Sequence, residues 1–416
     1  MHKALSPHLY VFACVIVIAI SLTIFTVLGL YRDFAILPVL ALGGFYAVMY
    51  FIRQCRHKDS NYFIDSNIDT TVLLRRAIAR YVVWLVVIYL GYQFYLLVPL
   101  YNTPQHYPTH RVYENFLHWY LWLGIPYFVL TLTFKASKQE DFYDPAVRMI
   151  HVVKQILLRI LRGDNQASVF YVLKKQYNRK VFLNLAMRAY FIPVMVEQIA
   201  PNTIVLLDNL YRELNGHEFM TLILLLLAIL WLADILNAAV AYCLESRWLE
   251  NRSRSIDLTV GGWLVCLSCY PPLNELTSTA FAFAPHLANN GAEGLLFSGE
   301  FFFYAIKILE VCLLGTLVYI DLSLGSSMAN ITLKKLQTRG PYSFVRHPGT
   351  TFKLLLWLMQ SIFYKKFWTA KYLFGFVMWG CIYILRALSE EHHLSKFSEY
   401  QAYRKKVKKR FIPGLF

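Results

Sequence analysis

Long apolar runs, repeated along the whole chain, constrain its fold more than any other feature. The hydrocarbon core of a bilayer is about 30 Å thick and needs roughly 20 apolar residues per helix. Lipid offers no hydrogen-bonding partner to the backbone, so such runs cross it as helices. The composition agrees, because 57% of the 416 residues are hydrophobic, against about 45–50% in soluble domains. The sequence therefore predicts an all-α, polytopic integral membrane protein.

We predict about ten transmembrane or re-entrant helices. They run over residues 9–30, 34–52, 81–100, 116–134, 181–200, 219–243, 259–273, 296–320, 350–364 and 370–388. The first run is too long for the apolar region of a signal peptide and has no clear small-residue cleavage site, so it is predicted to be a span. The seventh and ninth runs are short, which suits tilted, re-entrant or buried helices.

Lys and Arg concentrate in alternate loops, which predicts the orientation. The basic loops cover residues 53–80, 135–180, 245–258, 321–349 and 389–416. The positive-inside rule then puts both termini in the cytoplasm, in either a bacterial inner membrane or the endoplasmic reticulum. The formal net charge of +16 is explained by these loops facing anionic lipid headgroups. No basic domain interleaved with aromatics is present, so we expect membrane lipids as partners and no nucleic acid.

Four parts follow from this pattern. Residues 1–135 are predicted to be a four-span unit, 136–180 a cytoplasmic amphipathic basic segment, 181–290 the middle spans and 291–416 a module that ends in a cytoplasmic tail. One helical face of the basic segment is apolar and comprises Val152, Val153, Ile156, Leu157, Ile160 and Leu161. Such a face suits an interfacial helix on the cytoplasmic leaflet and equally a contact with a neighbouring subunit, so the oligomeric state stays open.

Charged residues inside the predicted spans are costly and are functional candidates. They comprise Arg188, Glu197, Asp234, Glu300, Lys307 and Glu310, with the polar Asn237 beside them. Lys307 and Glu310 are spaced i, i+3 and can pair on one helix face. The set fits either structural ion pairs or a polar lining for a substrate headgroup. Cys266 and Cys269 form an isolated CxxC, for which packing is favoured over metal or redox chemistry.

The stretch "TRGPYSFVRHPGTTFK", residues 338–353, carries the chemistry. Gly340 and Pro341 predict a turn, and Pro348 suits the first turn of a helix. Arg346 and His347 then lie at the mouth of the ninth span, near the positive end of its dipole. This arrangement favours an anion such as a carboxylate or phosphate.

Glu390 and Glu391 follow the last span on the same side of the membrane. Neighbouring residues point about 100° apart on a helix, so we expect one of the two to face a pocket. A carboxylate there can bind an ammonium group or ribose hydroxyls. A site with one anion-binding half, one cation-binding half and an aromatic rim suits a zwitterionic cofactor such as S-adenosyl-L-methionine. An aromatic ring can hold the sulfonium of this cofactor by a cation–π contact.

The strings "RGPYSFVRHP" and "EEHHLSKFSEYQAYRKKVKKRFIP" resemble the membrane methyltransferases of the isoprenylcysteine carboxyl methyltransferase and phospholipid N-methyltransferase group. The resemblance covers roughly the last 80 residues. It implies S-adenosyl-L-methionine as cofactor. The contacts that it implies are made by Tyr342, Arg346, His347, Pro348, Glu390, Glu391, Tyr400, Tyr403 and Arg404. One departure is that Gly349, Thr350 and Thr351 follow Arg-His-Pro, where the family usually has an aromatic.

The predicted reaction is methyl transfer to a membrane-embedded or lipophilic acceptor. Arg346, His347 and Arg386 are the candidate catalytic residues, and the position of Arg386 suggests that it holds an anionic acceptor. Prenylated cysteine, phospholipid amine, quinone and lipid thiol all fit as acceptors.

Two other functions fit the sequence. A nicotinamide-dependent sterol-type reductase has a similar tail, but its typical Arg-Asp-Glu is Ser389-Glu390-Glu391 here. A transporter or scaffold with a degenerate cofactor module would use Arg188, Asp234 and Lys307 for its substrate.

Overall fold

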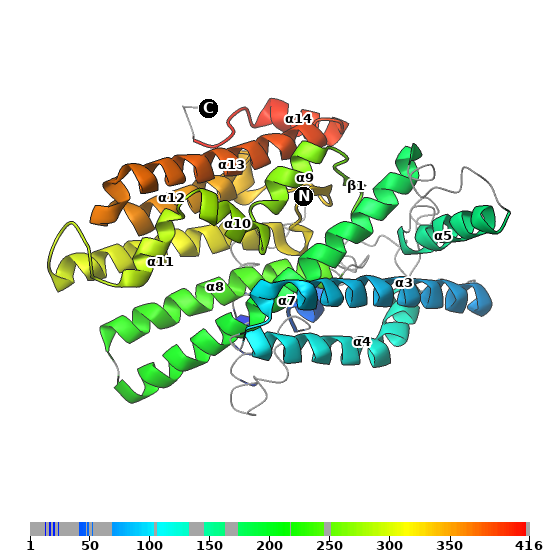
Figure 1. Cartoon of the computed structure of the whole chain (residues 1–416), viewed down its shortest axis with the longest axis horizontal. Helices are drawn as coiled ribbons and strands as arrows, with labels where there is room; N and C mark the ends of the chain where they lie inside the picture. The colour runs from blue at the N-terminus through cyan, green and yellow to red at the C-terminus, as the bar shows by residue number, and fades with distance from the viewer. Residues whose placement is uncertain are drawn as a thin grey trace.

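A computed structural model of the chain describes residues 69–103, 106–132, 145–162, 174–216, 218–244 and 251–412, with scattered positions between 13 and 52. The predicted spans 9–30 and 34–52 lie mostly outside these residues. The described part is mostly helical, as predicted (Figure 1).

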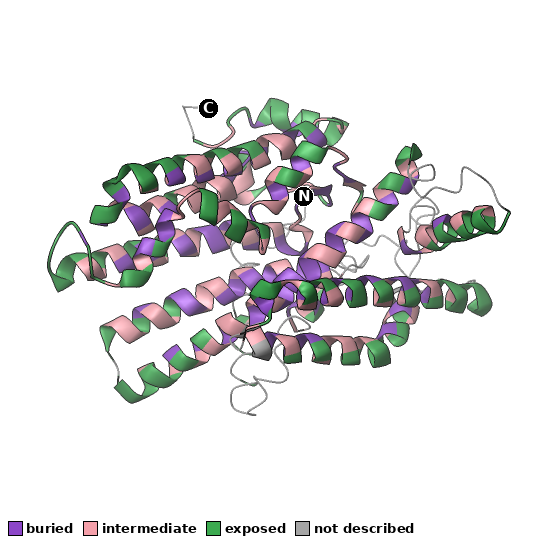
Figure 2. Ribbon diagram, in the orientation of Figure 1, coloured by how far each residue is buried: buried purple, intermediate pink, exposed green. Residues whose placement is uncertain are grey.

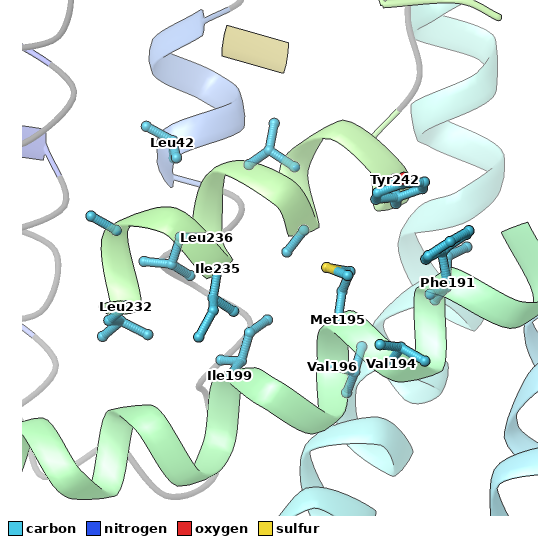
Figure 3. Packing of buried hydrophobic residues seen from close by; sticks show 14 of the residues in the cluster. Leu42, Phe191, Val194, Met195, Val196, Ile199, Leu232, Ile235, Leu236 and Tyr242 are labelled. Carbon is cyan, nitrogen blue, oxygen red and sulfur yellow. The ribbon is translucent and has the colours of Figure 1, made fainter. Parts of the chain in front are cut away.

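Two long antiparallel helices, α7 (Gln176–Gly216) and α8 (Phe219–Cys243), run through the middle of the molecule (Figure 1). The apolar residues of α8 occupy every face rather than one stripe, which is typical of a helix covered by apolar surroundings on all sides. Figure 3 shows the α7–α8 seam. The buried residues that meet there include Met195, Val196, Ile199, Leu232, Ile235 and Leu236.

The helices α3 (Thr70–Leu97), α4 (Tyr107–Leu132) and α5 (Pro145–Leu161) flank one side of α7, with the short 3-10 helix η2 (Pro99–Tyr101) between α3 and α4. Asp69 caps α3 by accepting a hydrogen bond from the Thr71 N–H, which satisfies a donor that the first helical turn leaves free. The hydroxyl of Tyr113 donates to the Ile88 carbonyl at 3.0 Å and joins α4 to α3.

The amphipathic helix predicted in the basic segment is present as α5. Val152 packs inward, whereas the remaining members of its apolar face are at least partly exposed. This helix therefore carries an apolar surface without a packing partner among the described residues.

The C-terminal helices pack over α8 (Figure 1). They are α11 (Glu300–Leu324), α12 (Pro348–Ile362), α13 (Ala370–Leu394) and α14 (Ser398–Lys406), joined through the 3-10 turns η6 (Gly325–Ser327), η7 (Gly340–Ser343) and η8 (Lys365–Trp368). α11 packs against both α8 and α12. The middle and C-terminal parts of the chain thus share a common set of packed helices.

The segment 251–299 connects these two groups of helices. Its strand β1 (Ser255–Ile256) pairs antiparallel with β2 (Thr332–Leu333). The predicted seventh span, residues 259–273, instead forms the short helix α9 (Val260–Leu267) and a turn. The helix α10 (Leu273–Ala280) begins at its last residue and is followed by the 3-10 helix η5 (Ala284–Asn290). At 1.5 Å per residue, eight residues reach only about 12 Å, so this run does not cross a bilayer as one helix. Consecutive prolines, Pro271 and Pro272, lack the N–H groups that a continuous helix needs.

Among the described residues, four helices are long and apolar enough to cross a membrane. They cover Gln176–Gly216, Phe219–Cys243, Glu300–Ser327 and Ala370–Leu394. Large apolar side chains are exposed, among them Leu97, Phe301 and Val377, and much of the surface of the helices is made of exposed residues (Figure 2). Both findings are compatible with a membrane protein, with fewer qualifying helices than the ten predicted from the sequence.

Candidate functional site

The Arg-His-Pro stretch folds locally as the sequence predicts. Gly340 has φ +62°, in the left-handed region that favours glycine, and begins the turn η7. Pro348 is the first residue of α12 and His347 is its N-cap. Proline is pre-organised for that position, so the motif begins a helix and holds Arg346 and His347 at its N-terminus.

The predicted anion at this helix N-terminus is the chain's own Glu391. Its Oε1 lies 3.0 Å from Arg346 Nε and 3.1 Å from His347 Nε2, and its Oε2 lies 3.1 Å from Arg410 Nε. Glu391, Arg346 and His347 are all buried. Two guanidinium groups and one imidazole thus converge on one carboxylate.

Backbone hydrogen bonds join the same motif to the tail. The Arg346 N–H donates to the Lys409 carbonyl at 3.0 Å, and the His347 N–H donates to the Arg410 carbonyl at 2.9 Å. The Thr351 hydroxyl donates to the Phe411 carbonyl at 3.1 Å. The start of α12, the end of α13 and residues 409–411 therefore form one unit, which we call the tail clamp.

Beside the tail clamp lies a cavity of about 450 Å³, within the roughly 300–1,000 Å³ typical of small-molecule sites. Its walls come from α7, α8, the turn between α9 and α10, α11, η7, α12 and α13. The polar lining comprises Gln198, Asn202, Asp234, Tyr242, Tyr270, Asn274, Asp321, Asn330, Tyr342, Arg346, His347, Thr350, Lys353, Tyr383, Arg386 and Glu390. Residues from the middle spans and from the C-terminal module thus face the same space.

The structure brings together only part of the predicted site. Tyr342, Arg346, His347, Arg386 and Glu390 line the cavity. Pro348 and Glu391 belong to the tail clamp and do not line it. Glu390 and Glu391 point apart, so one of the pair faces the pocket, as predicted.

Three further predicted residues lie outside the cavity. Tyr400 and Tyr403 are buried in a separate cluster with Leu333, Leu394 and Val407, and Arg404 is exposed. The Tyr403 hydroxyl donates to the Tyr342 carbonyl at 2.6 Å. Burial raises the pKa of Tyr403 to about 12, so its phenol keeps this proton. Tyr403 thus touches the cavity wall through the backbone of Tyr342, whereas the buried Tyr400 hydroxyl has no hydrogen-bond partner among the described residues.

Five ionisable side chains line the cavity without an ion-pair partner in the described part of the chain. They are the carboxylates of Asp234, Asp321 and Glu390 and the cations of Lys353 and Arg386. Unpaired charges in an enclosed site are expensive. A ligand that carries charges of both signs would compensate them.

Arg386 is held by a hydrogen-bond network centred on Asn330. Its Nη2 donates to Asn330 Oδ1, and Asn330 Nδ2 donates to the hydroxyls of Tyr242 at 2.7 Å and Tyr270 at 2.9 Å. The guanidinium carbon also lies 5.3 Å from the Tyr270 ring centroid and 5.7 Å from that of Tyr383. Because the guanidinium is fixed in this way, its remaining N–H donors keep a constant orientation, which favours binding of an anion.

Tyr342 lies on the cavity wall near two of the carboxylates. Burial, together with the negative charges of Asp321 and Glu390, raises the pKa of Tyr342 well above its ordinary value. Its phenol is therefore neutral and is available as a hydrogen-bond donor to a ligand.

The charged residues inside the predicted spans divide into structural and cavity-facing groups. Lys307 Nζ lies 2.8 Å from Glu310 Oε2, which confirms the predicted i, i+3 pair, and Gln360 Nε2 donates to the other carboxylate oxygen. Arg188 is buried and donates to Asn184 and to the Tyr242 carbonyl. These residues are structural, whereas Asp234 lines the cavity.

Sequence reasoning missed several cavity residues. Asp321 lies one residue beyond the predicted eighth span, and Lys353 lies inside the ninth. A lysine in the run "FKLLLW" was a usable signal, because charge within a span is a functional candidate. Asn330 and Tyr270 carried no comparable signal.

The cysteines of the CxxC are free and buried. Cys266 packs in the main core and Cys269 in a cluster with Trp357, Trp379 and Tyr383. Among the described residues, no group of His, Cys, Asp and Glu is arranged to hold a metal ion.

Comparisons of the chain with protein-family models, with curated proteins and with solved structures find no match.

Proposed function

We propose that the chain is an integral membrane methyltransferase that uses S-adenosyl-L-methionine and acts on a lipophilic acceptor. The observation that carries the proposal is the cavity with unpaired charges of both signs, formed beside the Arg-His-Pro helix start. The resemblance of the last 80 residues to membrane methyltransferases points to the same cofactor.

The residues on the cavity wall fit the functional groups of this cofactor. Arg386 and Lys353 would hold its carboxylate, and Glu390 its ammonium group. The rings of Tyr270 and Tyr383 and the phenol of Tyr342 line the same space and suit an adenine ring or a sulfonium. The bound cofactor supplies an activated methyl group, so the protein has to position the acceptor and exclude water.

This assignment changes the roles that the sequence suggested. Arg346 and His347 contribute to the wall, but both already contact the Glu391 carboxylate. We therefore assign Arg386 to the carboxylate of the cofactor, whereas its position in the sequence suggested that it holds an anionic acceptor. With both termini cytoplasmic, as the basic loops predict, the cofactor reaches this cavity from the cytoplasm.

The test is binding of S-adenosylhomocysteine to the purified protein in a neutral detergent, measured by calorimetry. We expect micromolar affinity that falls at least tenfold in Arg386→Gln and in Glu390→Gln. The exposed residues Arg212 and Glu293 provide the matched controls Arg212→Gln and Glu293→Gln, which keep wild-type affinity. Binding of a reduced nicotinamide dinucleotide in place of S-adenosylhomocysteine would favour the reductase, and binding of neither ligand would favour a transporter or scaffold.

A further inference from the structure

Asp234 of α8 and Asp321 of α11 face the cavity from helices outside the tail clamp. Asn237, one turn after Asp234, donates from Nδ2 to the backbone carbonyl of Asp321 at 3.0 Å, and its own Oδ1 accepts from the Tyr46 hydroxyl at 2.6 Å. These hydrogen bonds join α8 to α11 at this level, and the side chains of Asp234 and Asp321 lie close enough to interact with each other.

Neither carboxylate of this pair forms an ion pair with a described residue. Asp234 Oδ1 is shielded from solvent and accepts no hydrogen bond from the described part of the chain. Lys353 and Arg386 line the same cavity but form no ion pair with either aspartate. Two neighbouring carboxylates with a buried orphan oxygen are costly unless they share a proton or a positive group binds between them.

The departure from the family motif leaves room beside this pair. A Cβ placed on Gly349 would lie 3.4 Å from Asp321 Oδ1, and Thr350 lines the cavity as well. The family usually carries an aromatic just after Arg-His-Pro, and such a ring would fill this space. The small residues therefore let a ligand group reach Asp321 at the first turn of α12.

The neighbouring wall is apolar. Trp231, Ile235 and Ala238 of α8 and Leu317 of α11 line the cavity within about one turn of the two aspartates. A ligand that combines a cationic head with an apolar tail matches this arrangement, because burial of the tail contributes about 25 cal/mol per Å².

Resting on the proposed function, we propose that Asp234 and Asp321 form the acceptor subsite and that the acceptor is a lipophilic amine. The pair binds the ammonium group, and one carboxylate oxygen takes a proton from it, which frees the nitrogen lone pair. That lone pair forms the new N–C bond to the methyl carbon while the C–S bond of the donor breaks. The sulfur keeps the electron pair of the broken bond and becomes a neutral thioether, and the nitrogen carries the positive charge.

A binding measurement tests the subsite without turnover. The probe is dodecyltrimethylammonium, which carries the charge but has no proton to lose, titrated into the full-length protein in neutral detergent. We expect the affinity to fall at least tenfold in Asp234→Asn and in Asp321→Asn. Asp208→Asn changes an exposed aspartate of α7 and keeps wild-type affinity. Equal affinity in all four proteins would overturn the proposal.

An activity measurement tests the acceptor class. Wild-type protein is offered dodecylamine, dodecanoate or dodecanethiol with a methyl-labelled donor. We expect label in dodecylamine, at least a 100-fold loss in the two cavity variants, and competitive inhibition of the wild type by dodecyltrimethylammonium. Unchanged binding of S-adenosylhomocysteine in the variants shows that they are folded.

The outcomes separate the two proposals. Label in dodecanoate or dodecanethiol and not in dodecylamine would overturn the acceptor assignment while the methyltransferase function stands. Failure of the wild type to bind S-adenosylhomocysteine would remove the methyltransferase function itself, whatever the ammonium probe does.

Discussion

Replacing Glu391 by glutamine separates a structural role for this residue from a role in cofactor binding. Glu391 is 5% exposed and Arg346 is 6% exposed, so the substitution leaves a buried guanidinium without its counter-charge. Removing one partner of a buried ion pair costs about 3–5 kcal/mol. Glutamine keeps one acceptor oxygen, and Arg410 is partly exposed, so we expect the lower end, about 3 kcal/mol.

The lost interaction energy makes the tail clamp open more often. The amide hydrogens of Arg346 and His347 exchange with solvent only when their bonds to the Lys409 and Arg410 carbonyls open. With a tenfold change per 1.4 kcal/mol, 3 kcal/mol corresponds to roughly a 100-fold faster exchange. Hydrogen–deuterium exchange of ligand-free protein, followed by mass spectrometry of peptides covering residues 343–352, measures it.

The neighbouring residue provides a matched control. Glu390→Gln removes a carboxylate that faces the cavity and has no ion-pair partner in the described part of the chain, so exchange at Arg346 and His347 stays at the wild-type rate. Exchange in Glu391→Gln within threefold of the wild type would refute the reasoning. Glu391 would then not hold the tail, and the ion pairs would contribute little.

Three more substitutions test the geometry. Thr350→Tyr introduces an aromatic ring where the methyltransferases that the tail resembles usually have one, and it fills the space beside the aspartate pair. We expect dodecylamine methylation to fall at least tenfold while S-adenosylhomocysteine affinity changes less than threefold; equal losses of both would contradict the prediction. Lys307→Met leaves Glu310 buried without its partner and lowers the free energy of unfolding by about 3–5 kcal/mol. The double variant Lys307→Met, Glu310→Leu recovers most of this stability, as measured by thermal unfolding in detergent. A double variant less stable than the single one would speak against a structural pair. Gly375→Ala places a methyl group against a backbone carbonyl of the segment before η5 and costs about 1–3 kcal/mol. Gly380→Ala, which meets open space in the same helix, does not lower the unfolding midpoint, because alanine is the better helix former.

The sequence by itself determined the features that depend on neighbouring residues. The helical character follows from apolar runs of bilayer length, and Pro348 and Gly340 mark a helix start and a turn because of their restricted or permissive backbone. The Lys307–Glu310 pair follows from the i, i+3 geometry of a single helix. One carboxylate of Glu390 and Glu391 faces the cavity for the same helical reason.

Only the tertiary structure decided which charges meet. Glu391 reaches Arg346, His347 and Arg410 across three segments, so the anion expected at the start of α12 is supplied by the chain. The aspartates come from α8 and α11, and Lys353 from α12, and they face one cavity because those helices pack side by side. Such encounters depend on the packing of elements distant in sequence, and no local period or spacing encodes them. The same holds for the apolar run 259–273, which predicts a span, whereas the structure ends α9 at Leu267 and packs it against α13.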